Sequence, residues 1–332
     1  MNYIGSKYSL MDFLTATITA VAGTNTNKTF ADLFAGTGVV GKTFRENGYQ
    51  VFSNDIQYYS YVLNKHYMEN SPPLNVKKLE YLNQLQGTKG FIYKNFCAGS
   101  GSGRNYFTDE NGQKCDSIRI ELERLKNCGE IDESQYYYLL ASLINSIDKY
   151  ANTAAVYGAF LKQIKKSAAR EFKLELLPVI SGNLQSKAYN DNISDLITKI
   201  GGDILYLDPP YNARQYCSNY HVLETIAKYD KPTLKGKTGL RNSLNQKSEF
   251  CSARTVVQAF DSIIKNADFN YIFLSYNNEG LMPFEIIKNT MQKYGEYEMF
   301  STDYHRFKAD NDENRNHKAT KTTEYLHCLI KK

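Results

Sequence analysis

The chain has 332 residues, 42% of them hydrophobic, so it is long enough to bury one large core or two of ordinary size. This composition excludes wholesale disorder, and no apolar run is long enough for a transmembrane helix. The net charge of +5 permits a nucleic-acid partner without demanding one.

The cysteines and histidines show no pattern typical of a metal site or a disulfide framework. The six cysteines are scattered, and the five histidines lack ligand spacing. The first residues also lack the charged and then apolar layout of a secretory signal. We therefore expect a cytoplasmic protein with no bound metal and no membrane partner.

The first predicted elements alternate between strand and helix. A β-prone run ends in a glycine-rich turn, a helix follows, a second strand stops at an acidic residue, and helical spacing then returns. These elements cover residues 29–34, 39–45, 50–53 and 58–68. The order predicts the opening of a doubly wound parallel sheet.

The pattern changes after residue 70. Loop signals and apolar helical spacing replace strand signals, and the spacing predicts helices over 116–126, 134–149 and 154–175. We interpret residues 71–179 as an inserted, mainly helical region and a candidate for DNA binding and target recognition. A catalytic α/β domain would then comprise residues 1–70 and 180–332.

Strand–helix alternation resumes near residue 188. We expect strands at 188–189, 203–207 and 271–276, and helices at 193–200, capped by Gly201 and Gly202, and at 254–266. Residues 304–307 and 325–330 flank a polar tract and predict a long antiparallel hairpin with a flexible tip. The fold class is a mostly parallel, doubly wound Rossmann-like sheet that ends in this hairpin.

The turn Gly36-Thr37-Gly38-Val39-Val40-Gly41 has the pattern G-x-G-x-x-G, and Asp55 follows the next strand. Glycine at the end of the first strand lets backbone approach a ligand, and an acidic residue after the second strand can accept hydrogen bonds from ribose hydroxyls. The motif therefore predicts an adenosine-containing cofactor, and an NAD-linked oxidoreductase remains an alternative. Asp32 favours S-adenosylmethionine, because an anion attracts its sulfonium and ammonium groups and repels a pyrophosphate.

The segment Asp208-Pro209-Pro210-Tyr211 ends the most apolar strand, where an open α/β sheet binds its ligands. The two prolines make a stiff extended corner. Adenine N6 is a poor nucleophile, and two acceptors on its N–H groups, the Asp208 carboxylate and the Pro209 carbonyl, would free its lone pair. Tyr211 would stack on the base, a contribution of about 1–3 kcal/mol.

Taken together, these motifs resemble the D12 class of DNA adenine-N6 methyltransferases. The resemblance covers the segment 2–7, the segment 32–38, Asp55, the segment 208–211, and Tyr276 to Gly280 after the next long strand. It implies a methyltransferase with a Rossmann-like sheet, S-adenosylmethionine as cofactor and double-stranded DNA as substrate. It further favours a type II restriction–modification system in a bacterial or archaeal cell, with a cognate restriction endonuclease as functional partner, and leaves a solitary regulatory methyltransferase as the alternative. The cofactor contacts implied are Tyr3, Lys7, Asp32, Phe34, Gly36, Gly38, Asp55 and Asp208.

One position departs from that family. Where members often carry an acidic residue after the third strand to hold the cofactor's adenine amino group, this chain has Asn192, with Asp191 beside it. Either side chain offers an oxygen acceptor, so both remain candidates.

A duplex hides adenine N6, so the base must be rotated out of the stack, and phosphate contacts are needed near the catalytic corner. On the predicted helix 160–173, Lys162, Lys166 and Arg170 would share one face. Lys237 and Arg241 lie in a polar loop at 230–254 and form a second candidate set. The same chemistry on RNA is an alternative, and the recognition sequence does not follow from these residues.

Overall fold

The computed structural model describes residues 3–24, 27–74, 77–183, 185–305 and 321–332. The chain divides into two compact units. The helical unit comprises Met1–Ile4, Gln57–Ile180 and Tyr216–Asn245, and the sheet unit comprises Gly5–Ile56, Ser181–Gln215 and Gln246–Lys332. The helical unit thus extends beyond the expected insertion and also takes in residues 57–70 and 216–245.

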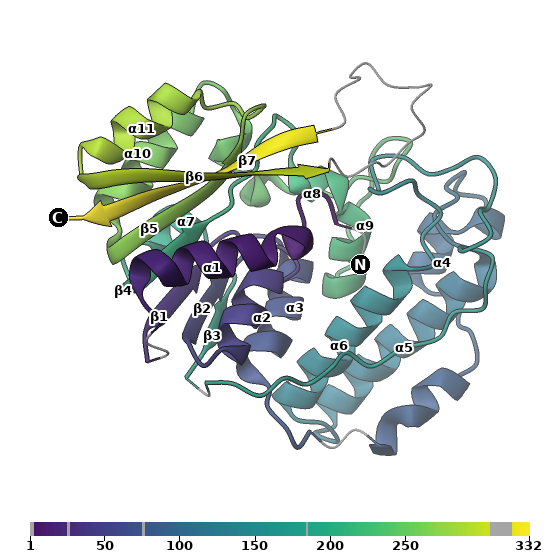
Figure 1. Cartoon of the computed structure of the whole chain (residues 1–332). Coiled ribbons are helices and arrows are strands. Elements are labelled where there is room, and N and C mark those ends of the chain that lie inside the picture. Colours follow the sequence, from purple (N-terminus) through teal and green to yellow (C-terminus); the bar gives the residue numbers. More distant parts are fainter. Residues whose placement is uncertain (1–2, 25–26, 75–76, 184, 306–320) are drawn as a thin grey trace. The chain divides into compact units, whose positions relative to one another are not determined.

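The sheet unit is built on one seven-stranded sheet with the order β3-β2-β1-β4-β5-β7-β6 (Figure 1). The first five strands run parallel, and β7 pairs antiparallel with both β5 and β6. Their bounds are β1 Thr29–Asp32, β2 Gln50–Asn54, β3 Lys187–Tyr189, β4 Gly201–Leu207, β5 Asp268–Asn277, β6 Gly295–His305 and β7 Lys321–Lys331. The predicted mostly parallel sheet and its antiparallel hairpin are confirmed, while the predicted hairpin tip at 306–320 lies outside the described residues.

Side chains alternate between the two faces of this sheet, as the period of a strand requires. On one face Ala31, Leu205 and Ile272 join a buried cluster. That cluster includes residues of α7 (Ile193–Leu196), α10 (Val256–Asn266) and α11 (Phe284–Gln292). On the other face Phe30 of β1 stacks on Phe44 of α2 (Val39–Glu46), with ring centroids 3.8 Å apart. Both faces are therefore covered, which explains the buried apolar runs Phe30–Ala31 of β1 and Ile204–Leu207 of β4.

Local sequence explains where two helices of this unit begin. Gly38 is left-handed, with φ of 79°, and caps the start of α2. The Asn192 side chain caps α7 by accepting the backbone N–H of Ser194 at 2.9 Å. Helix α7 is shorter than predicted, and Gly201 and Gly202 open β4 instead of ending the helix. Helix α1 (Met11–Ala22) carries no motif and had not been predicted.

The helical unit contains the predicted helices at 116–126 and 134–149, which are confirmed within α5 and α6. Helix α6 begins with a capping box, in which Asp132 and Gln135 each satisfy the other's backbone N–H. The helical elements of the unit are α3 Tyr58–Glu69, η2 Lys77–Gln84, α4 Phe91–Phe96, η3 Ala98–Ser100, α5 Asp109–Asn127, α6 Glu133–Asp148, α8 Tyr216–Asn219 and α9 His221–Lys228.

The predicted helix at 154–175 is wrong. This segment is irregular, and side chains from other parts of the chain, Asn111 of α5 among them, bond part of its backbone. Asn111 bonds the carbonyls of Ala168 and Arg170 and the N–H of Phe172. Apolar residues at helical spacing predicted a helix here, but the backbone hydrogen bonds go to a residue distant in sequence, which the spacing cannot reveal. Within the described residues, every helix is too short or too polar to cross a lipid bilayer.

Candidate active site

The candidate site lies at the carboxyl edge of the sheet, where the strand order reverses. Strand β1 lies between β2 and β4, so the residues that end these three strands are neighbours. Asp32 ends β1, Asp55 follows β2 and Asp208 follows β4. This is the switch point at which open α/β sheets bind ligands, so the three predicted carboxylates share one edge.

The glycine turn has the shape that the sequence predicted. Gly36 and Gly38 are both left-handed, with φ of 52° and 79°. The Ala35 N–H donates to the Asn54 carbonyl at 2.9 Å, and the Gly36 N–H donates to Oδ2 of Asp55 at 2.9 Å. The turn is therefore tied to the end of β2.

Asp32 is a buried carboxylate with an unsatisfied oxygen. Its side chain is 1% exposed, and Oδ1 has no hydrogen-bond partner among the described residues. Burial, the nearby Asp208 carboxylate and Asp55 raise its pKa to about 8, although the backbone N–H groups of Gly41 and Phe34 oppose this shift. An uncompensated carboxylate of this kind fits a cationic ligand group.

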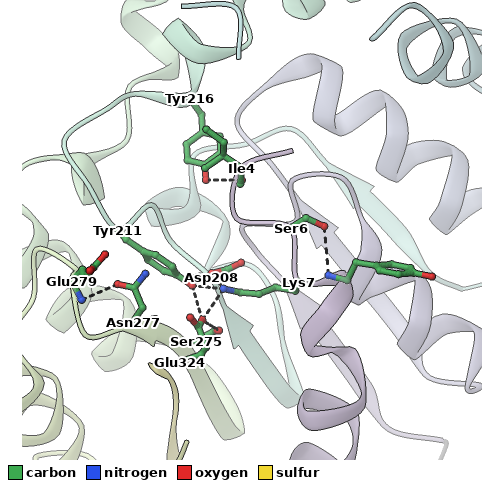
Figure 2. A network of polar contacts seen from close by, with 11 residues as sticks. Ile4, Ser6, Lys7, Asp208, Tyr211, Tyr216, Ser275, Asn277, Glu279 and Glu324 are labelled. Atoms are coloured by element: carbon green, nitrogen blue, oxygen red, sulfur yellow. Dashed lines mark hydrogen bonds and ion pairs between the residues drawn. The ribbon is translucent and has the colours of Figure 1, made fainter. Parts of the chain in front are cut away.

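The Asp208 corner holds a network of polar side chains from distant parts of the chain (Figure 2). Nζ of Lys7 lies 3.1 Å from Oδ1 of Asp208 and 2.7 Å from Oε1 of Glu324. The Tyr211 hydroxyl lies 2.6 Å from Oδ1 of Asp208 and 2.9 Å from Oε1 of Glu324, and it also accepts from Lys7. Ser275 donates to Oε1 of Glu324 at 2.6 Å. One ammonium group is thus shared by two carboxylates.

Burial raises the pKa of Asp208 to about 6, with Lys7 lowering it and Glu324 raising it. Burial also lowers the pKa of Lys7, but the carboxylates of Asp208 and Glu324 outweigh this and hold that pKa above its ordinary value. Lys7 is therefore charged at neutral pH, and Asp208 is mainly ionised and able to accept hydrogen bonds.

The loop after β5 supports Tyr211 from its other side. The rings of Tyr211 and Tyr276 pack edge to face, with centroids 5.0 Å apart. The Leu281 N–H donates to the Tyr211 carbonyl at 3.0 Å, and the Met282 N–H donates to the Tyr276 hydroxyl at 3.2 Å. A Cβ at Gly280 would overlap the Tyr276 ring, so this glycine permits the close approach.

The remaining predicted cofactor residues of the sheet unit lie near these strand ends. Asp191 is exposed, and its N–H donates to Oδ1 of Asn54 at 3.0 Å. The side-chain oxygen of Asn192 already caps α7. Phe34 packs edge to face on Phe250, with centroids 5.1 Å apart.

Tyr3 belongs to the helical unit. Its buried ring stacks on Tyr220 with centroids 4.8 Å apart, and its hydroxyl lies 3.3 Å from that of Tyr59. The structure thus gives Tyr3 a packing role within that unit.

The basic residues predicted to bind DNA also lie in the helical unit. Lys162, Lys166, Arg170 and Lys237 are exposed, although the first three are not on a helix. Arg241 is buried, and its guanidinium binds the Asp230 carboxylate through two hydrogen bonds of 3.0 and 2.6 Å. This bidentate pair gives Arg241 a structural partner.

Glu324 and Ser275 were missed by the sequence analysis. Both are 0% exposed and both touch the network around Asp208. A charged residue at the start of an otherwise apolar run, 325–330, was the available signal for Glu324.

Comparison with known proteins agrees with this geometry. Residues 3–293 match the family model of the D12 class N6 adenine-specific DNA methyltransferases. The type II methyltransferase M.NlaIII of Neisseria lactamica is 52% identical over 100% of this chain and 99% of that protein. M.CviAII of Paramecium bursaria Chlorella virus 1, also a type II methyltransferase, is 34% identical over 93% of each chain.

M.FokI of Planomicrobium okeanokoites, again a type II methyltransferase, is 38% identical over 100% of this chain but only 53% of that protein. No solved structure matches the chain at a significant level.

Proposed function

This chain belongs to the D12 class of N6 adenine-specific DNA methyltransferases, and we propose that it is the modification enzyme of a type II restriction–modification system. Its methyl donor would be S-adenosylmethionine, and its target an adenine rotated out of duplex DNA. Family membership decides against the NAD-linked alternative that the glycine turn had left open. A cognate restriction endonuclease would be a functional partner, and the enzyme would work in the cytoplasm, with the DNA that it protects.

The main support for S-adenosylmethionine as cofactor is Oδ1 of Asp32, which has no hydrogen-bond partner among the described residues. S-adenosylmethionine supplies an electrophilic methyl group on a sulfonium and also carries an ammonium, so a buried carboxyl group that can ionise beside that cation is matched to it. Asp32 would accept a hydrogen bond from the ammonium, and Asp55 would accept hydrogen bonds from the ribose hydroxyls. Gly36 and Gly38 leave room for the ligand.

The adenine end of the cofactor would meet Phe34 and Asp191. We favour Asp191 over Asn192 as the acceptor for the adenine amino group, because the Asn192 oxygen is engaged in capping α7. At the methionine end, Lys7 lies on the same network as Asp208, whereas Tyr3 would act through the packing of the N-terminal segment.

The Asp-Pro-Pro-Tyr corner would bind the target amine. Lys7 and Tyr211 both contact Oδ1 of Asp208, so Oδ2 is the oxygen offered to an N6 hydrogen. The Pro209 carbonyl would accept the second hydrogen, and Pro210 keeps the corner extended. With both hydrogens held, the nitrogen lone pair is free for attack, and positioning supplies most of the acceleration. Tyr211 would stack on the base.

DNA would be held through its phosphates by exposed cations. Lys162, Lys166, Arg170 and Lys237 are accessible for this purpose. We leave Arg241 out of this set, because its guanidinium is already bound to Asp230.

Methyl transfer from tritiated S-adenosylmethionine to matched duplex DNA and duplex RNA tests the proposal. We expect label on N6 of adenine in DNA only, and methylation-sensitive sequencing of DNA from expressing cells should give one recognition sequence. Asp208→Ala should abolish transfer while retaining cofactor binding, and Gly36→Val should abolish cofactor binding itself. Normal turnover by Asp208→Ala would refute the amine-acceptor role, and labelled RNA would refute the choice of substrate.

A further inference from the structure

Glu324 is a buried carboxylate at the point where β7 passes the Asp208 corner. It lies opposite Asn277 of β5 and Thr302 of β6 in the sheet register. Its side chain is 0% exposed, and Oε1 is contacted by Lys7 at 2.7 Å, Ser275 at 2.6 Å and Tyr211 at 2.9 Å. Three elements far apart in the sequence therefore converge on one oxygen atom.

Stability alone does not account for a carboxylate at this place. Leu326 and Cys328, the next residues on the same face of β7, are apolar and fully buried. A buried ion pair is often no more stable than apolar side chains of similar volume. In addition, Oε2 of Glu324 has no hydrogen-bond partner among the described residues. The carboxylate of Glu324 is better explained by its effect on the side chains that it contacts.

Those neighbours are the two side chains that contact Asp208. Tyr211 has a single hydroxyl hydrogen and lies within hydrogen-bond distance of both carboxylates. Lys7 lies between the same two groups, closer to Glu324 than to Asp208. Glu324 thus draws the ammonium away from Asp208 and fixes the hydroxyl end of the Tyr211 ring.

We propose that Glu324 is a positioning residue for methyl transfer: it holds Lys7 and Tyr211 against Oδ1 of Asp208, so that Oδ2 stays free to accept from the target amine. This inference rests on the proposed function. Two further titratable groups face this corner: Asp32 on β1, whose pKa is raised by burial and by the Asp208 carboxylate, and Tyr206 on β4, whose pKa is raised by burial and by Asp208 and Glu324. Neither hydrogen bonds to Glu324 in the described structure, so replacing Glu324 should leave them in place.

The test compares wild type with Glu324→Gln, which keeps the shape and removes the charge. We expect kcat at saturating DNA and S-adenosylmethionine to fall about 10- to 100-fold, the size typical of misplaced reacting groups. The dissociation constant of S-adenosylmethionine should change less than about threefold. Glu298→Gln, at an exposed position of β6, is the matched control and should behave as wild type.

The pH profile separates positioning from a merely structural role. The negative charge of Glu324 raises the pKa of Asp208, so its removal should lower that pKa. Because Asp208 acts as the ionised form, the acid limb of the kcat profile should move to lower pH in Glu324→Gln. A structural defect alone would reduce kcat without moving that limb.

Each outcome decides the matter. If wild type transfers methyl groups and Glu324→Gln matches it in kcat and pH profile, the positioning role is overturned; a loss of cofactor affinity with an unmoved acid limb overturns it too. If Glu324→Gln does not fold, Ser275→Ala removes only one donor to Glu324, and kcat should fall about threefold or more. An unchanged kcat there overturns the role. A wild type that methylates no DNA refutes the proposed function instead.

Discussion

The carboxylate of Asp55 accepts a hydrogen bond from the backbone N–H of Gly36, with an N–O distance of 2.9 Å. The acidic residue after β2 therefore shapes the glycine turn as well as facing the proposed ribose position. These two roles can be separated, because the first needs one oxygen acceptor and the second needs a carboxylate.

Asp55→Asn and Asp55→Ala should differ in their free energy of unfolding. Both should bind the cofactor more weakly than wild type. Asn keeps an oxygen for the Gly36 N–H, so the free energy of unfolding should stay near that of wild type. Affinity for S-adenosylmethionine should fall about 10-fold in both. Asp55→Ala should also lose about 1 kcal/mol of stability. Calorimetric titration and denaturant unfolding measure both quantities, with the exposed Asp12→Asn as control. Equal unfolding curves for the two variants would contradict the role in the turn.

Cofactor binding should release a proton near neutral pH. The pKa of Asp32 is raised to about 8 in the ligand-free protein, so the group is largely protonated at pH 7. A bound ammonium would favour the ionised form, and affinity should therefore rise with pH up to about 8 and then level off. Titrations in buffers of different ionisation enthalpy count the protons released. Asp32→Asn is the control and should release no proton on binding. If wild type also released no proton, contact between Asp32 and the cation would be excluded.

The same carboxylate should make the ligand-free protein less stable at alkaline pH. Between the unfolded pKa of 3.8 and the folded value of about 8, the native state binds more protons than the unfolded state. Unfolding free energy therefore falls as pH rises through this interval, by up to about 1.4 kcal/mol per pH unit. Asp32→Asn should flatten this dependence and be the more stable protein at pH 8. Parallel curves for the two proteins would argue against the raised pKa.

Gly280→Ala should reduce both stability and transfer. The added Cβ would overlap the Tyr276 ring, which packs on Tyr211. We expect a loss of about 1–3 kcal/mol, as for other overpacked sites, and a lower kcat. Gly158→Ala is the control, because its Cβ would meet no atom nearer than Cγ2 of Val156 at 4.0 Å. Identical melting temperatures for the two variants would show that the Tyr276 ring can move aside.

Replacing Lys162, Lys166 and Arg170 with Gln should weaken DNA binding and flatten its salt dependence. If all three contact phosphates, the slope of log K against log salt should lose about 2.7 units. The control replaces exposed lysines of the sheet unit, Lys199, Lys265 and Lys293. Fluorescence anisotropy across a salt series measures both slopes. A slope equal to that of wild type would remove these residues from the DNA interface.

The sequence was sufficient to predict which side chains gather at the sheet edge. Asp32, Asp55 and Asp208 each follow a strand that could be recognised, and parallel strands bring their carboxyl ends together. Strands β5 and β7 were also predictable as strands, because residues 271–276 and 325–330 are apolar runs of the length of a buried strand. Local sequence patterns were therefore enough to predict the strands whose apolar residues follow the period of a strand.

The rest depended on partners distant in sequence. Residues 154–175 have apolar residues at helical spacing, yet Asn111 takes over the hydrogen bonds of part of that backbone. The role of Glu324 required knowing that β7 pairs with β5 in a register that sets Glu324 opposite Asn277 and within reach of the Ser275 hydroxyl. The residues around 154–175 give no sign of Asn111, and the charge before the apolar run 325–330 marks Glu324 as unusual without showing what it contacts.

The last strand in sequence is not the last in space, since β7 inserts between β5 and β6. A nascent polypeptide would expose the inner edges of β5 and β6 until the final residues leave the ribosome and dock there. During that interval Lys7 and Asp208 have already been synthesised, but Glu324, the second carboxylate that binds Lys7, has not. Premature termination shortly before Glu324 would therefore yield a chain with every recognisable motif and an unfinished reaction centre.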